Sequence, residues 1–246
     1  ADGAMSNVRK ATGISQDHVA YNQSGLVAVV KKQRDNPGVA WQRFLPTGPL
    51  AFLPLNDGRS SIVWTLPTQE AGRLLSLDNE AFTDELNSAS EGWLGNVETC
   101  GPRAAFPLTM RLSKCYASRR TVLVGDAAHV VHPLAGQGVN LGLADIAALT
   151  EILVSARQSG RDIGSAEVMQ SYDLNRRSES NAMAMGMHAI HGLYGIEALS
   201  PLRRIGSSIV RRSTTVKEVF LRRAAGLGHN APRLATGSTL QDLMRN

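Results

Sequence analysis

Cysteine is nearly absent from this sequence, and so are segments that would direct a chain into a membrane. The 246 residues include only Cys100 and Cys115, which fit neither a disulfide framework nor a CxxC metal site. No apolar run approaches the roughly 18 residues that a membrane-spanning helix needs. The start, Ala1-Asp2-Gly3, has neither the basic nor the apolar region of a signal peptide. We therefore expect a cytoplasmic protein.

Two common nucleotide-binding fingerprints are missing as well. No GxxxxGK[ST] phosphate loop occurs, and the glycine-rich stretch 136–142 is not a GxGxxG directly after a strand. His129 and His132 are three residues apart, but Pro133 disfavours the regular helix that would bring both to one metal ion. We expect no metal site.

Positive charge is concentrated at the C-terminal end. The whole chain has a formal net charge of +5, and from Pro201 onward nine Lys or Arg residues face only two acidic ones. A basic segment of this kind is typical of contact with an anionic membrane surface, nucleic acid or an acidic partner. The same charges also fit a solvated helix face, so the charge pattern alone leaves these alternatives open.

The first half of the chain has the pattern of an antiparallel sheet. Short apolar runs are separated by turn signals such as Asn36-Pro37-Gly38 and Asn56-Asp57-Gly58. This spacing predicts a meander with hairpin connections, followed by two helices and a closing strand. The expected strands are 26–30, 40–44, 51–55, 61–65 and 106–112, and the expected helices are 68–75 and 79–88.

The pattern changes near residue 119. The uninterrupted apolar run 121–124 predicts a central parallel strand that is covered on both faces. Residues 139–154 predict a helix that is apolar on most sides and therefore buried. From residue 166 to the end the pattern is helical. The chain thus reads as a mixed fold with both α/β and α+β character.

The segment 125–142 carries the features of a ligand site. Asp126 directly follows an apolar run, and ligands of α/β sheets bind beyond the carboxyl ends of strands. Its carboxylate suits the hydroxyl groups of a sugar or polyol. Gly136 and Gly138 would let the backbone approach a flat ring, and the following helix would direct its free N–H groups to the same place. A glycine turn that only caps a helix is the alternative interpretation.

Three motifs together resemble one family. The stretch GDAAHVVHPLAGQGVNLGLADIAAL (125–149) resembles the second flavin motif and signature of the ubiquinone-biosynthesis hydroxylases. ADGAMSNVR (1–9) is similar to the DG motif of that family, and WQRFLPTGPLAFLPL (41–55) to a third stretch. These enzymes are class A flavoprotein monooxygenases with a para-hydroxybenzoate hydroxylase-like fold.

The resemblance implies a division of the chain into four parts. Residues 1–16 would be a remnant of the FAD-binding domain, and 17–112 a β-rich substrate domain with a mixed sheet. Residues 113–160 would return to the FAD-binding domain, and 161–246 would form a helical C-terminal region. The βαβ unit with GxGxxG that should precede residue 1 is missing, so we expect an N-terminally truncated fragment that is inactive by itself.

The resemblance also implies site residues. No side chain is assigned as catalytic, because the cofactor carries the chemistry. Substrate would contact Gln42, Phe44, Leu53 and Pro54. The residues expected to bind FAD are Asp2, Gly3, Arg9, Gly125, Asp126, Pro133, Ala135, Gly136, Gln137, Gly138, Val139 and Asn140.

The implied activity is hydroxylation of the aromatic ring of a polyprenylated phenol, with NAD(P)H as the reductant of FAD. Such a substrate lies in lipid, so the basic end would hold the enzyme peripherally at the inner membrane or in a biosynthetic complex. No nucleic-acid partner is expected. The alternatives are a flavin oxidoreductase that does not hydroxylate, and a non-catalytic scaffold of a biosynthetic complex.

Overall fold

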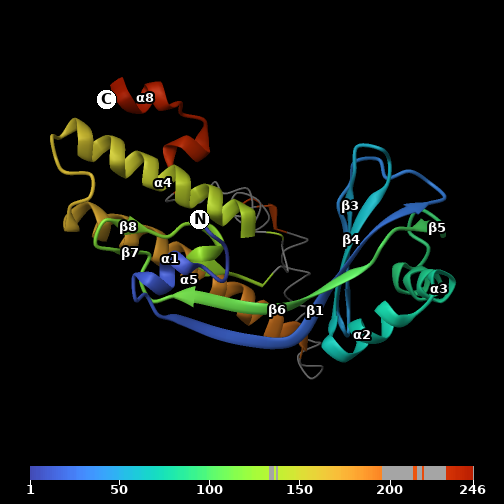
Figure 1. The fold of residues 1–246 in the computed structure, drawn as a ribbon. Helices are drawn as coiled ribbons and strands as arrows, with labels where there is room; N and C mark the ends of the chain where they lie inside the picture. The colour runs from blue at the N-terminus through green and yellow to red at the C-terminus, as the bar shows by residue number, and fades with distance from the viewer. Residues whose placement is uncertain (133–135, 137, 196–212, 215–217, 219–230, 246) are drawn as a thin grey trace. The chain divides into compact units, whose positions relative to one another are not determined.

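A computed structural model describes the chain except for residues 133–135, 137, 196–212, 215–217, 219–230 and 246 (Figure 1). The chain divides into two compact units. Unit 1 contains Ala1–Val19 and Thr109–Asn246, and unit 2 contains Ala20–Leu108. Two long strands, β1 (Gln16–Lys32) and β6 (Ala104–Ser113), each begin in one unit and end in the other.

Unit 2 is built on an antiparallel sheet. The strands β2 (Trp41–Leu45), β3 (Gly48–Pro54) and β4 (Ser60–Pro67) follow one another, β4 pairs with β1, and β5 (Val97–Cys100) pairs with β1. Glycine is required in the first hairpin, because a Cβ on Gly48 (φ 140°) would lie 2.5 Å from the carbonyl oxygen of Thr65. The predicted meander is confirmed, and so is the closing strand in β6.

The core of unit 2 lies on one face of this sheet. Alternate residues of the strands are buried there, and two helices cover them: α2 (Thr68–Ser76) and α3 (Asn79–Ser90). Asp78 caps α3 by accepting a hydrogen bond from the Ala81 amide at 2.8 Å. The two helices predicted at 68–75 and 79–88 are therefore confirmed. The core residues of the sheet and helices are Leu26, Ala28, Val30, Leu50, Phe52, Ile62, Trp64, Leu66, Ala71, Leu74, Phe82 and Leu86.

Unit 1 combines short strands with long helices. Its first helix is α1 (Asn7–Ala11), and a 3-10 turn, η1 (Gly125–Ala127), precedes β9 (His129–Val130), which pairs antiparallel with β6. The remaining elements are β7 (Ala117–Ser118), β8 (Thr121–Val122), α4 (Gly138–Gln158), α5 (Ala166–Gly195), η4 (Arg233–Thr236) and α8 (Leu240–Arg245). Helix α4 packs against α5, η1, η4 and α8.

The prediction of a central parallel strand at 121–124 is wrong for the described chain. Only residues 121 and 122 form a strand, and they pair antiparallel with β7 in a two-stranded hairpin. The run is apolar because Leu123 is fully buried in a cluster with Tyr116 and Tyr172, not because strands flank it. Burial against side chains of α4 and α5 gives the same apolar signal as burial inside a sheet.

The prediction that α4 is buried on most sides is also wrong. Val139, Leu143 and Ile146 are 73%, 59% and 52% exposed, and they share one face of the helix. Mean hydropathy over its 18-residue window is 1.5, so by length and composition α4 could cross a membrane. A search for uninterrupted apolar runs misses α4, because Asp145 and Glu151 interrupt it.

The C-terminal region is described only in part. The prediction of helix from residue 166 is confirmed in α5. Most of the basic end lies outside the described residues, namely Arg203, Arg204, Arg211, Arg212, Lys217, Arg222 and Arg223.

Candidate cofactor site

The predicted DG segment forms an ordered turn before α1. The Ser6 amide donates to the Gly3 carbonyl at 3.0 Å, and the Ser6 hydroxyl caps α1 by accepting from the Arg9 amide at 2.9 Å. Gly3 has a φ of 84°, which favours glycine. The Asp2 carboxylate accepts from the Val8 amide at 3.1 Å. The pKa of Asp2 is lowered to about 2, first by a hydrogen bond with the Ser6 side chain and second by the one from the Val8 amide. Asp2 therefore stays ionised and shapes its own turn.

Arg9 joins the two segments that the sequence predicts to bind FAD. Its side chain is buried, with only 6% of the residue exposed. One guanidinium nitrogen donates to the Ala4 carbonyl at 3.2 Å and to the Ala127 carbonyl at 3.3 Å. Ala127 is 118 residues away in the sequence and directly follows Asp126. The fold thus places the DG segment beside the loop of the second flavin motif.

The loop around Gly125 approaches α4 closely. Gly125 has a φ of 59°, a left-handed conformation that few other residues adopt without strain. A Cβ on Gly142 of α4 would lie 3.4 Å from the Gly125 Cα. The Ala128 amide donates back to the Gly125 carbonyl at 2.8 Å, which closes the 3-10 turn. Glycines at these two positions let the loop and the helix lie against each other.

Asp126 is the one exposed residue in a buried loop. Ala127, Ala128 and His129 are all buried, whereas Asp126 is exposed. Within the described part of the chain its carboxylate makes no hydrogen bond or ion pair. The loop therefore presents one free carboxylate to its surroundings, as a ligand-binding residue requires.

Sequence reasoning missed the residue beneath this loop, Asp145. It lies in the middle of α4 and is fully buried. Its Oδ2 accepts from the Gly125 amide at 2.9 Å and lies 2.7 Å from His129 Nε2, and its Oδ1 accepts from Arg176 Nε at 2.9 Å. The only local signal for it is an aspartate within the apolar stretch 141–149 of α4, because buried carboxylates are rare without partners.

The glycine-rich turn before α4 is described only in part. Gly136 is exposed with a φ of 63°, a conformation that suits glycine. Gly138 begins α4, and Val139 and Asn140 in its first turn are exposed. The other residues predicted in this turn, Pro133, Ala135 and Gln137, lie outside the described residues.

The four predicted substrate residues belong to unit 2. Gln42 and Phe44 of β2 and Leu53 of β3 share the face of the sheet opposite the core, because Gln42 pairs with Ala51 and Phe44 with Pro49. All three are exposed. Pro54 alternates to the other face, with Phe52. The structure thus groups three of the four residues.

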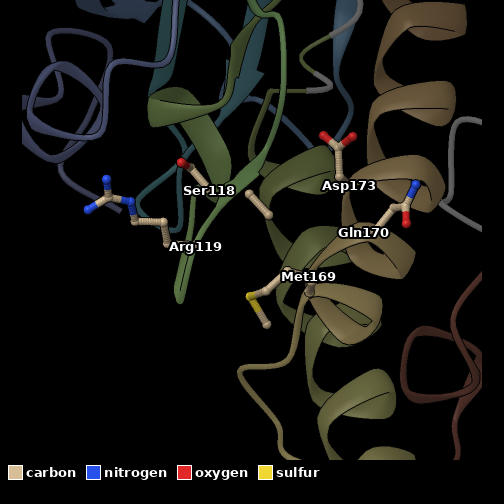
Figure 2. A pocket seen from close by; sticks show the side chains of 7 residues that line it. Ser118, Arg119, Met169, Gln170 and Asp173 are labelled. Carbon is tan, nitrogen blue, oxygen red and sulfur yellow. The ribbon is translucent and has the colours of Figure 1, made fainter.

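A small pocket in unit 1 is separate from the predicted cofactor residues (Figure 2). Ser118 and Arg119 come from the β7–β8 hairpin, and Met169, Gln170 and Asp173 from α5. Its volume is about 240 Å³, below the usual range for cofactor sites. The Asp173 carboxylate is already used, since it accepts from the Tyr116 amide at 2.6 Å. We assign no ligand to this pocket.

The arrangement of elements matches solved structures of aromatic hydroxylases. The p-nitrophenol 4-monooxygenase PnpA from Pseudomonas putida aligns with a TM-score of 0.69 at 17% identity, over 92% of this chain and 58% of that one. OxyS anhydrotetracycline hydroxylase from Streptomyces rimosus aligns with a TM-score of 0.65 at 21% identity, over 92% and 45%. These likenesses confirm the predicted fold, that of the para-hydroxybenzoate hydroxylase-like flavoproteins.

Sequence comparison then gives the family. Residues 1–186 match the model of the FAD binding domain family, to which this chain belongs. The chain is 39% identical to the ubiquinone hydroxylase UbiL of Rhodospirillum rubrum, over 98% of this chain and 57% of that protein. It is 36% identical to the 3-demethoxyubiquinol 3-hydroxylase of Escherichia coli, over 92% and 58%. The chain thus spans a little over half the length of these relatives, and the predicted family resemblance is confirmed.

Proposed function

We propose that the protein that carries this chain is an FAD-dependent monooxygenase that hydroxylates the aromatic ring of a polyprenylated phenol. The observation that carries the proposal is the bond from Arg9 to the Ala127 carbonyl, which unites both predicted flavin segments in one unit. The names of the two relatives support the substrate class, since one is a ubiquinone hydroxylase and the other a 3-demethoxyubiquinol 3-hydroxylase.

The described residues fit FAD. The free carboxylate of Asp126 would accept hydrogen bonds from ribityl or ribose hydroxyls, for which a carboxylate is well suited. Gly3 and Gly136, both at positive φ, would let the backbone approach the pyrophosphate and the ring. The first turn of α4, with Gly138, Val139 and Asn140, would direct amide groups toward negative charge on the flavin.

When bound, FAD would supply the redox chemistry, accepting a hydride from NAD(P)H and activating O₂ for transfer to the ring. The residues of the chain would orient the cofactor and exclude water. We assign residues 17–112 as the substrate domain, and the exposed face with Gln42, Phe44 and Leu53 as part of its lining. No side chain need act as an acid or base in this account.

The proposal is tested by product analysis on the protein at its full natural length. With FAD, NAD(P)H, O₂ and a short-chain prenyl phenol, we expect a hydroxylated product and its loss in Asp126→Ala. NAD(P)H oxidation without hydroxylated product would instead indicate a flavin oxidoreductase. A protein that neither binds FAD nor loses function in Asp126→Ala would be a scaffold, and that result would overturn the proposal.

We also propose that the basic end holds the enzyme at an anionic membrane surface. The support is the charge after residue 200, where nine Lys or Arg residues accompany only two acidic residues. Replacement of Arg211, Arg212, Arg222 and Arg223 by Gln should weaken binding to vesicles that contain anionic lipid, whereas replacement by Lys should preserve it. Unchanged vesicle binding by the Gln variant would contradict membrane association and favour a protein partner.

A further inference from the structure

A single carboxylate organises the loop that presents Asp126. Asp145 is fully buried, and its two oxygens have separate tasks. Oδ1 pairs with Arg176, which is itself buried and neutralises the charge. Oδ2 serves the loop, through the Gly125 amide at 2.9 Å and His129 Nε2 at 2.7 Å. Because an ionised carboxylate only accepts hydrogen bonds, Nε2 of His129 carries the proton.

The two bonds to Oδ2 bracket Asp126 in the sequence. Gly125 lies immediately before it and His129 three residues after it, so one oxygen fixes both ends of the turn. Between them, the Ala127 carbonyl accepts from Arg9 and the Ala128 carbonyl from the Ser113 amide. Every backbone segment around Asp126 is thus tied to buried partners, while its own carboxylate is left free.

The Gly125 amide has its hydrogen-bond acceptor on the helix that lies next to the loop. Gly125 has a φ of 59°, and its amide donates to the Asp145 carboxylate of α4. Without an acceptor, the amide would be left unsatisfied beside α4, which comes so close that a Cβ on Gly142 would lie 3.4 Å from the Gly125 Cα. The turn would then relax, and the direction of the Asp126 side chain would change with it.

We propose that Asp145 is the positioning residue of the cofactor site, holding the Gly125–His129 loop so that Asp126 points at FAD. This inference rests on the proposed function, since it takes Asp126 as a ligand of FAD. It goes further by assigning a role to a residue that is fully buried and that bonds to Gly125, His129 and Arg176. The competing interpretation is that Asp145 only stabilises unit 1 through its buried pair with Arg176.

The substitution Asp145→Asn separates these interpretations, because it changes the two oxygens unequally. The remaining amide oxygen can still accept from Arg176, and the amide nitrogen can donate to the other tautomer of His129. The Gly125 amide alone loses its acceptor. We expect the dissociation constant of FAD to rise about ten- to a hundredfold, as for a lost hydrogen bond to a charged group.

Asp173→Asn is the matched control. Asp173 is also buried, accepts from a backbone amide, that of Tyr116, and pairs with an arginine, Arg177. It makes no contact with the loop 125–129 among the described hydrogen bonds and ion pairs. Asp173→Asn should therefore lower the unfolding midpoint, by less than Asp145→Asn because Arg177 is partly exposed, yet leave FAD affinity within about twofold of wild type.

A double-mutant cycle with Asp126→Ala gives the decisive readout. If Asp145 acts through Asp126, then Asp145→Asn weakens FAD binding in the wild-type background but has no further effect once Asp126 is alanine. Additive effects, or wild-type affinity in Asp145→Asn, would overturn the inference. Failure of the wild-type protein to bind FAD would refute the proposed function instead. If Asp145→Asn does not fold, His129→Leu takes its place, and unchanged affinity in that variant contradicts the inference.

Discussion

The core of unit 2 and the cofactor loop of unit 1 are held in place by different kinds of contact. In unit 2, a sheet and two helices bury a large apolar cluster, and many side chains share the task. In the cofactor loop of unit 1, the geometry depends on a few buried polar contacts between residues far apart in sequence, those of Arg9 and Asp145 above all. The loss of one apolar contact lowers stability gradually, because many others remain. The loss of one partner in a buried polar contact leaves the other group without a hydrogen bond. We therefore expect mutations in the cofactor loop to affect FAD binding most, and mutations in the core of unit 2 to affect stability most.

The three tryptophans make this difference measurable. Trp41, Trp64 and Trp93 all lie in unit 2, two of them in contact with Phe52. Tryptophan fluorescence therefore reports the unfolding of unit 2, and the absorbance of bound FAD reports the site proposed in unit 1.

The largest effect should come from Phe52→Ala. Phe52 is fully buried in contact with Trp41 and Trp93, and its removal would leave a cavity in the core. We expect a loss of about 3–5 kcal/mol in the free energy of unfolding followed by tryptophan fluorescence. Leu53→Ala, on the exposed face of the same strand, is the control and should cost far less. A loss below about 1 kcal/mol in Phe52→Ala would contradict the assigned core.

Arg9→Met should affect FAD binding, followed by the absorbance of the bound flavin. The variant keeps the apolar stem but loses both carbonyl contacts, of which the bond to Ala127 joins the two segments. FAD affinity should fall about tenfold or more, as expected for a charge-assisted hydrogen bond. The tryptophan transition should stay unchanged. Lys10→Met, at the exposed neighbouring position, should alter neither signal. Equal effects of the two variants would contradict a specific role of Arg9 in FAD binding.

Lys32 should make the stability of unit 2 depend on pH. It is buried beside Phe52 and donates to the Ser90 hydroxyl at 2.9 Å, and burial lowers its pKa from 10.5 to about 8. Between these values the unfolded chain binds more protons than the folded one, so stability rises as the pH increases from about 8 to 10.5. Lys32→Met should reduce this rise by something on the order of 1 kcal/mol.

The control for this titration is Lys31→Met, which removes an exposed lysine at the neighbouring position. Urea unfolding followed by tryptophan fluorescence at pH 7.5 and 10, as approximate end points of the window, measures the slope. The same slope in wild type and in Lys32→Met would show that the buried lysine does not titrate there.

The smallest effect should follow Arg120→Ala. Arg120 and Asp162 form an ion pair at 2.5 Å, but both side chains are more than half exposed. Solvent and salt screen such pairs, so we expect no measurable change in the unfolding followed by tryptophan fluorescence or in FAD binding. A clear loss of FAD binding in this variant would mean that surface charge in unit 1 matters more than the buried contacts do.

The sequence predicted the elements whose signals are local. The strands and helices of unit 2 follow from alternating apolar residues and from turns such as Asn56-Asp57-Gly58, where each residue acts through its neighbours. The segments 1–9 and 125–149 were found because the motifs themselves are contiguous. Local patterns were enough for the elements of unit 2, whereas the overall fold and the candidate site were predicted from the family resemblance of these motifs.

The sequence did not predict what depends on distant partners. Nothing local reveals that Asp145 receives the Gly125 amide 20 residues away or Arg176 from another helix. The run at 121–124 was misassigned because a strand between strands and a segment beneath helices have the same apolar composition. The exposure of α4 was missed because hydrophobicity predicts burial without saying what covers a face.

The central claim is that the segments 1–9 and 125–149 form one flavin site around Asp126. It is tested most directly by titrating the full-length protein with FAD and following the visible absorbance of the flavin, in wild type and in Asp126→Ala. We expect saturable binding with a shifted spectrum in wild type, and affinity at least tenfold weaker in the variant. Equal affinity in the two proteins, with circular dichroism showing that both are folded, would contradict the claim.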